Sequence, residues 1–253
     1  AKLTNVYSTK FSVKIKDGEN KCIYTQEWSN NMKTCGTPKI KKYSSATSSV
    51  SITFIPDWKR FGMSKMDETI YKIFEKRVYD ANICTSQNCK VKFQGEPLPK
   101  CTFNTYAKMY TKTDEMCTFT SDRWSVCIAP SDDGFEHVSF VNGICTTKGG
   151  SHVDHVSGIL ANGVIEDMAK KIKLRPQQVK NAFFVFVKAT LVNPSFSSQV
   201  KSECTLKPQD FGSKFEPPKT FIKNILKTSI QSELTALSKF REMKELKKTD
   251  GSR

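Results

Sequence analysis

A short polar segment near residue 200 carries the residue types best suited to holding an anion. Gln199 offers an amide and Lys201 an ammonium two positions later. Hydrogen bonds from a charged donor to an anion are stronger than neutral ones, so this pair suits an anionic group. The alternative is an ordinary surface lysine, which is the base expectation for any one of 40 lysine and arginine residues.

A strongly apolar stretch must position this pair. Residues 182–192 are rich in aromatic and β-branched side chains, which predicts a buried β-strand. Asn193-Pro194 ends the strand, because proline has no N–H for the next ladder hydrogen bond. A rigid strand therefore leads into an exposed loop that carries Lys201.

The remaining second half of the chain reads as an α/β layer with its own core. Strands are expected at residues 124–129 and 135–141, on either side of a turn at 132–134. A helix is expected at 155–171, and one or two more at 220–248.

The first half reads as a sheet with few helices. Residues 3–31 alternate as two strands around Asp17-Gly18, and 49–54 form another strand. Residues 68–81 have helical spacing, and 90–93 make one more strand. The strands outnumber what these helices can cover, which predicts half of an α/β sandwich with its other helices upstream.

Composition favours a folded, basic protein. The 253 residues are 38% hydrophobic and carry a net charge of +15, which indicates a polyanionic partner such as DNA or RNA. An anionic membrane surface would fit the charge equally well. No apolar run approaches the ~20 residues needed to span a bilayer, so no transmembrane helix is expected.

The nine cysteines favour reduced thiols in a cytosolic or nuclear protein over the disulfide framework of a secreted one. Their number is odd, their spacing is irregular, and no leader precedes them. Cys84 and Cys89 form the closest pair, but no second pair completes a zinc site.

Motifs along nearly the whole chain resemble one family. FEHVSFVNGI at 135–144 and TKGGSHVD at 147–154 are similar to the transducer domain of eukaryotic-type type IIA DNA topoisomerases. The latter part of the same enzymes' ATPase domain is similar to residues 3–11, 26–32, 52–57 and 77–80. Residues 193–199 and 210–213 extend the match in family order.

The resemblance implies an α/β (α+β) chain: a partial GHKL-type α/β sandwich followed by a transducer α/β domain. Residues 1–105 would be the C-terminal part of the ATPase domain and 106–235 the transducer. Residues 236–253 would be a helical linker toward the DNA-cleavage domain.

The resemblance also implies a function. The family uses ATP to close a dimeric clamp around one DNA duplex and drive it through a break in another. This implies ATP and Mg²⁺ as cofactors, a DNA duplex as partner, a homodimer formed through the complete ATPase region, and no membrane. The expected location is the nucleus, or a cytoplasmic replication site if the enzyme is viral.

In the family, the lysine of a Gln-Thr-Lys loop reaches the γ-phosphate of ATP. Gln199 and Lys201 match that loop as ATP contacts, with Lys201 in a catalytic role, whereas Val200 departs and offers no hydroxyl. Ala1 and Lys2 match the tail of the family's glycine-rich phosphate loop. The glutamate, asparagine and aspartate that position water, metal and adenine lie upstream in the family, so we expect no hydrolysis by this stretch alone.

A basic cluster before Pro176 is the candidate DNA contact, and the matching segment of the family is basic too. Its members are Lys170, Lys171, Lys173 and Arg175. The alternative is a solvated helix end, where cations suit the helix dipole.

Gly149-Gly150 before Ser151-His152 indicates a tight turn that opens a helix, since no motif places a nucleophile beside His152. A stand-alone basic nucleic-acid-binding module without nucleotide chemistry is the competing function, and charge alone does not separate it from the topoisomerase reading.

Overall fold

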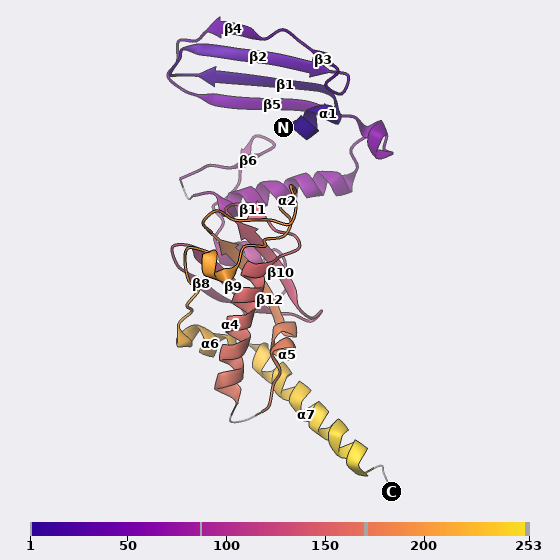
Figure 1. Ribbon diagram of the computed structural model, residues 1–253, viewed down its shortest axis with the longest axis vertical. Coiled ribbons are helices and arrows are strands. Elements are labelled where there is room, and N and C mark those ends of the chain that lie inside the picture. The colour runs from indigo at the N-terminus through magenta and orange to yellow at the C-terminus, as the bar shows by residue number, and fades with distance from the viewer. Residues whose placement is uncertain (1, 87, 170–171, 251–253) are drawn as a thin grey trace. The chain divides into compact units, whose positions relative to one another are not determined.

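The computed structural model describes residues 2–86, 88–169 and 172–250 (Figure 1). The chain forms two compact units, Ala1–Phe74 and Glu75–Arg253, and the division falls inside helix α2 (Glu68–Cys84). Each unit combines helices with β-sheet, which confirms the α/β (α+β) class. No described helix is both long and apolar enough to cross a membrane.

Unit 1 is built on an antiparallel sheet that follows the short helix α1 (Lys2–Val6). Its strand order is β3-β2-β1-β5, and β4 also pairs with β2. The strands are β1 (Ser8–Asp17), β2 (Cys22–Ser29), β3 (Thr34–Cys35), β4 (Lys39–Lys42) and β5 (Ser49–Pro56).

The first hairpin is confirmed, but its turn is longer than the two residues expected. Four residues separate β1 from β2, and the Asp17 carboxylate accepts hydrogen bonds from the Glu19 and Asn20 N–H groups, at 3.0 and 2.9 Å. An aspartate that binds backbone groups two and three residues ahead stabilises such a turn locally. Val6 lies in α1 and not in a strand.

The register of unit 1 gives its sheet one apolar face. Phe11 of β1 pairs with Trp28 of β2 and with Phe54 of β5, so the three side chains share a face. Phe11 is buried, whereas Phe54 is 40% exposed and Ile52, on the same strand and face, is 52% exposed. This exposed apolar face has the character of the inner side of a sandwich.

Unit 2 is built on a sheet of order β11-β10-β12-β9-β8. The strands are β8 (Cys117–Thr120), β9 (Trp124–Pro130), β10 (Glu136–Val141), β11 (Ile144–Cys145) and β12 (Phe183–Ala189). β12 lies between β9 and β10, antiparallel to the first and parallel to the second. The two strands around the 132–134 turn are therefore not neighbours.

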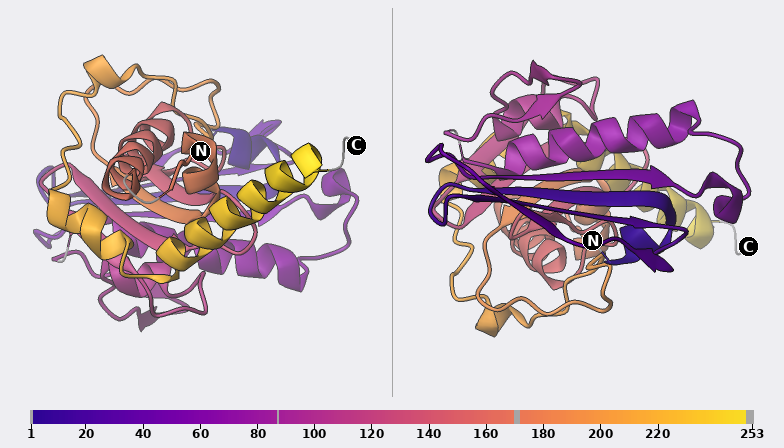
Figure 2. Two further views of the ribbon diagram at one scale, coloured as in Figure 1. Left: turned by 90° about the horizontal axis from the view of Figure 1, so that it is seen from below. Right: turned by 90° about the horizontal axis from the view of Figure 1, so that it is seen from above.

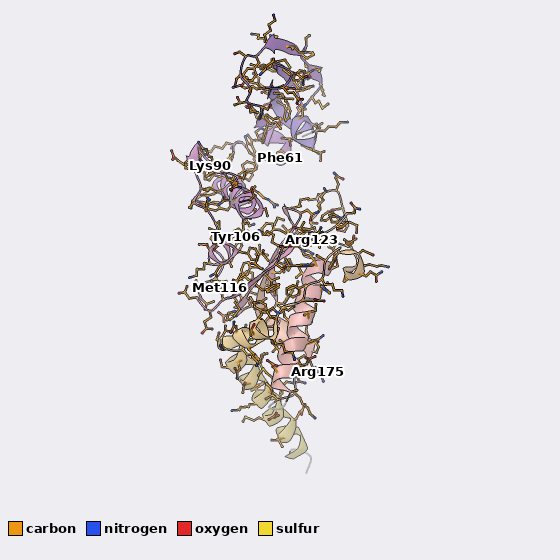
Figure 3. The ribbon with its side chains drawn as sticks, turned by 90° about the vertical axis from the view of Figure 1, so that its left-hand side faces the viewer. Phe61, Lys90, Tyr106, Met116, Arg123 and Arg175 are labelled. Atoms are coloured by element: carbon orange, nitrogen blue, oxygen red, sulfur yellow. The ribbon has the colours of Figure 1, made fainter. Side chains whose placement is uncertain are left out.

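The central strand β12 is buried on both faces, which explains its continuous apolar sequence. Phe183, Val185 and Val187 face one core, and Phe184 and Phe186 face the other. Helix α4 (Ser151–Met168) covers the first face (Figure 2). The second core includes Tyr106 of α3 (Phe103–Ala107; Figure 3) and Ile83 near the end of α2.

The remaining elements of unit 2 are α3 (Phe103–Ala107), α4 (Ser151–Met168), α5 (Pro176–Asn181), α6 (Lys219–Ile225) and α7 (Ser229–Asp250), with a small hairpin of β6 (Lys92–Phe93) and β7 (Glu96–Pro97). The described residues also form two 3₁₀ turns, Trp58–Phe61 in unit 1 and Pro208–Asp210 in unit 2. The helix expected from residue 155 begins four residues earlier, because Gly150 occupies its N-cap position. The terminal segment forms two helices.

The C-terminal half of α2 is fixed within unit 2 by polar contacts. Asp80 is buried and accepts a hydrogen bond of 2.6 Å from the Tyr106 hydroxyl and 3.0 Å bonds from Lys76. Lys188 of β12 donates to the Ile83 carbonyl at 3.2 Å, near the end of the helix. The proposed family boundary at 105/106 is a different division from these compact units and stays a prediction.

Candidate functional site

The exit from β12 is held by a paired amide contact. The strand ends at Ala189, a few residues before the predicted break at Asn193-Pro194. The Asn142 side chain donates to the Leu191 carbonyl at 3.0 Å and accepts from the Leu191 N–H at 2.8 Å. Asn193 then takes a left-handed backbone, with φ of 46°. The strand thus leads into the loop in one fixed direction.

Residues 195–205, which we call the lysine loop, fold back on themselves. The Thr205 N–H donates to the Ser195 carbonyl at 2.9 Å, and the Ser197 N–H donates to the Glu203 carbonyl at 3.1 Å. At the tip, the Lys201 N–H donates to the Ser198 carbonyl at 3.0 Å. The lysine loop is therefore an irregular hairpin whose tip holds Gln199 and Lys201.

The tip presents both predicted anion-binding groups. Gln199 is exposed, and Val200 between them is 81% exposed. The Lys201 ammonium lies 5.6 Å from the centre of the Phe196 ring, a cation–π contact. Among the described residues no carboxylate lies within ion-pair distance of it, so its charge is available to an anionic ligand.

The base of the lysine loop is attached to the segment before α4. The Cys204 N–H donates to the Gly149 carbonyl at 3.0 Å, and the Ser151 N–H donates to the Cys204 carbonyl at 3.0 Å. Sequence reasoning assigned Gly149-Gly150 only to a turn that opens a helix. The structure shows that this segment also binds Cys204 of the lysine loop, and no local signal in the sequence identifies that contact.

A buried hydroxyl and imidazole network fixes that same segment. The Ser139 hydroxyl donates to the Thr146 carbonyl at 3.0 Å, and the Thr146 hydroxyl lies 3.2 Å from His152 Nε2. Burial, with a smaller contribution from nearby His137, lowers the pKa of His152 to about 3, so the ring is neutral at pH 7. Burial also lowers the pKa of His137, against the charge of Asp154.

The other predicted ATP contacts lie at the start of the chain. Lys2 is exposed and begins α1 in unit 1, and Ala1 lies outside the described residues. Lys201 belongs to unit 2.

The basic cluster is described in part. Lys170 and Lys171 lie outside the described residues, whereas Lys173 and Arg175 are exposed. Ile172 precedes Lys173, Leu174 lies between the two cations, and both apolar side chains pack against the core. This alternation of inward apolar and outward basic side chains fixes the direction of both cations.

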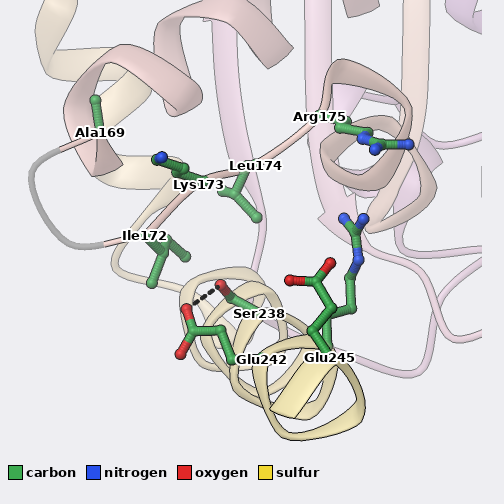
Figure 4. A pocket seen from close by; sticks show the side chains of 9 residues that line it. Ala169, Ile172, Lys173, Leu174, Arg175, Ser238, Glu242 and Glu245 are labelled. Atoms are coloured by element: carbon green, nitrogen blue, oxygen red, sulfur yellow. Dashed lines mark hydrogen bonds between the residues drawn. The ribbon is translucent and has the colours of Figure 1, made fainter. Parts of the chain in front are cut away.

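The segment borders a groove of about 610 Å³ beside α7 (Figure 4). Lys173 and Arg175 line it from one side. Ser238, Arg241, Glu242 and Glu245 of α7 line it from the other, so the groove is mixed in charge.

The described residues contain no group of three or more His, Cys, Asp or Glu side chains placed to hold a metal ion. Burial raises the pKa of Cys84 to about 12, so its thiol stays protonated at neutral pH. A protonated thiol is a poor metal ligand.

The fold matches known ATPase regions. The ATPase region of Saccharomyces cerevisiae topoisomerase II superposes with a TM-score of 0.89 at 34% identity, over 94% of this chain and 63% of that one. DNA topoisomerase 2 of Arabidopsis thaliana is 35% identical over all of this chain. DNA topoisomerase 2 of Acanthamoeba polyphaga mimivirus is 38% identical over 99% of it. The chain spans 18% and 20% of these two relatives.

These similarities define the class of protein as part of the ATPase region of a type II topoisomerase. The family model for DNA gyrase B matches residues 95–244, and the chain belongs to that family. The resemblance recognised in the motifs is thereby confirmed.

Proposed function

We propose that this chain is the nucleotide-sensing part of an ATP-dependent type II DNA topoisomerase. The observation that carries the proposal is the Lys201 ammonium at the tip of an anchored loop, where it contacts the Phe196 ring and has no carboxylate partner among the described residues. In a complete enzyme, Lys201 and Gln199 contact the γ-phosphate of ATP and couple nucleotide state to closure of a dimeric DNA clamp.

The proposed chemistry is electrostatic. A fixed ammonium stabilises the negative charge on the phosphate that is transferred, and an amide donor adds a directed hydrogen bond. Val200 contributes no side-chain hydrogen bond, and its exposure suits a residue that only links the two donors. Positioning of water and metal belongs to residues upstream, so this stretch alone is inactive in the proposal.

The rest of the assignment follows from the same family. ATP and Mg²⁺ are the expected cofactors, with metal ligands upstream, and Ala1 and Lys2 are the tail of the phosphate loop. Residues 1–105, 106–235 and 236–253 are proposed as ATPase domain, transducer and linker. The proposed enzyme works as a homodimer on duplex DNA, in the nucleus or at a viral replication site.

A switch in such an enzyme needs two states and a part that moves as a body. The lysine loop is attached at its base both to β12 and to the start of α4. A phosphate that holds Lys201 would therefore act on the sheet and on α4 together. The lysine loop is therefore the proposed input for rigid-body movement of the transducer.

The basic segment is proposed to contact the phosphate backbone of the captured DNA. Replacing Lys170, Lys171, Lys173 and Arg175 with glutamine should lower the slope of log affinity against log salt concentration by up to about 3.6, because each phosphate contact contributes about 0.9. The measurement is binding of a DNA duplex to the purified protein at several salt concentrations.

A matched control has the same change in net charge. Lys90, Lys92, Lys100 and Lys112 are exposed lysines of unit 2 that lie outside the segment, and their replacement with glutamine should leave most of the slope intact. An equal fall in slope for both variants would show that only total charge matters, which would favour a solvated helix end.

A further inference from the structure

The lysine loop and the segment before α4 run together as a short parallel contact. The Lys148 N–H donates to the Ser202 carbonyl at 2.8 Å, the residue directly after Lys201. Gly150 and Cys204 form a parallel β-bridge. The Ser151 hydroxyl adds a hydrogen bond of 3.3 Å to the Cys204 carbonyl. We call this set of contacts the glycine clamp.

The glycine clamp depends on the absence of a side chain at position 150. A Cβ atom there would lie 2.1 Å from the Cys204 carbonyl oxygen and 2.7 Å from its backbone nitrogen. Neither atom is the flexible end of a side chain, so the backbone itself would have to move. Gly150 also has φ of 117°, a conformation that other residues rarely adopt.

Gly149 is constrained in a different way. A Cβ atom there would lie 2.9 Å from His137 Nε2, and its φ is 71°. The close neighbour in this case is a side chain of β10. The two glycines thus let the segment pass between β10 and the lysine loop.

The segment that carries the glycine clamp is also held by α4 and by β10. Ser151 is the first residue of α4, and Val156, Leu160 and Val164 of that helix are fully buried in the core. The network of Ser139, Thr146 and His152 ties the same segment to β10. Any displacement at Gly150 would therefore be taken up by the lysine loop.

We infer that Gly150, with Gly149, is a positioning residue for Lys201: the glycine clamp sets where the ammonium stands relative to β10 and α4. The inference rests on the proposed function of Lys201. A turn that only opens α4 would not need the approach to Cys204, because a helix N-cap accepts several residue types. The 2.1 Å approach is specific to the lysine loop.

The first test measures the glycine clamp in this chain without ATP. Cys204 is 1% exposed beneath the clamp, and Cys127 is fully buried in the sheet. Peptide-resolved alkylation should label Cys204 at least tenfold faster in Gly150→Ala than in the parent, with the Cys127 rate unchanged. The matched control is Gly158→Ala, in the middle of α4, where an added Cβ meets nothing within 4 Å. Its Cys204 rate should equal that of the parent.

Faster labelling of both Cys204 and Cys127 would mean that Gly150→Ala unfolds the protein as a whole. A less disruptive variant then tests the inference. Ser151→Ala removes the two hydrogen bonds of the Ser151 hydroxyl, to the Cys204 carbonyl and to the Cys204 sulfur, and adds no atom. It should raise the Cys204 rate two- to fivefold, and an unchanged rate in this variant would overturn the inference. An unchanged rate in a folded Gly150→Ala would overturn it as well.

The second test uses ATP hydrolysis by the complete enzyme. Gly150→Ala should lower kcat at least tenfold with little change in the KM for ATP, and adding Lys201→Ala should cause no further loss. If instead the fold-loss in kcat of the double variant equals the product of the two single-variant losses, the glycine clamp does not act through Lys201. If Lys201→Ala alone has no effect, the proposed function fails, while the alkylation result still stands for the contact itself.

Discussion

Replacing Lys201 with alanine is expected to slow ATP hydrolysis by the complete enzyme more than tenfold. A charge-assisted hydrogen bond to the transferred phosphate is worth at least about 1.4 kcal/mol, and that energy corresponds to a factor of ten in rate. The substitution removes the one charged group at the tip of the lysine loop. Steady-state hydrolysis at saturating ATP measures the effect.

The fold should survive this substitution. The Lys201 side chain has one cation–π contact, with Phe196, and such a contact near the surface contributes about 0.5–1 kcal/mol. Lys207, exposed just beyond the loop, offers a control with the same loss of charge. Lys207→Ala should hydrolyse ATP at the parent rate. A Lys201→Ala enzyme as fast as the parent would remove the basis of the nucleotide-sensing proposal.

Acid is expected to destabilise unit 2 through His152. The ordinary pKa of the imidazole is 6.5, and burial lowers it to about 3 in the folded protein. Below pH 6.5 the unfolded chain binds a proton that the folded chain does not, so stability is full above that pH and falls toward pH 3. The whole window corresponds to roughly 5 kcal/mol, at about 1.4 kcal/mol for each pH unit.

The variant His152→Leu should lack this part of the acid sensitivity. Between pH 6.5 and pH 4.5, the free energy of unfolding should fall by roughly 2 kcal/mol less than in the parent, as measured by denaturant titration. His155→Gln is the control, because that imidazole is only partly buried although its pKa is also lowered by burial. Identical pH dependence in His152→Leu and the parent would show that the ring is protonated in the fold.

Local pattern was enough to predict the elements that carry the site. The apolar run of β12 follows from side-chain type, which is a local property. The strand ends at Ala189, a few residues before the break predicted from the missing proline N–H. The same holds for β9, β10 and α2, whose positions agree with the periodicity of their side chains. An exposed loop after β12 could also be predicted, because the chain must return to the protein surface once a buried strand ends.

The contacts between elements were not predictable in this way. The place of β12 between β9 and β10 depends on the crossover through α4, which brings β10 and β12 together in parallel. Residues that pair between these two strands are 48 positions apart in the sequence, as Val141 and Ala189 are. The approach of Gly150 to Cys204 joins segments more than fifty residues apart, and the sequence shows only two glycines. Short pieces such as α3 and β8 were missed because each has few residues to display a period.

The backbone of Lys201 has a consequence for the balance between stability and activity. Its φ of 59° places a residue with a long side chain in the left-handed region, where a non-glycine residue costs about 1 kcal/mol. Glycine at this position would suit the fold better and would carry no ammonium. The tip of the loop thus keeps a charged side chain in a strained backbone conformation. Such strain is typical of functional positions in folded proteins.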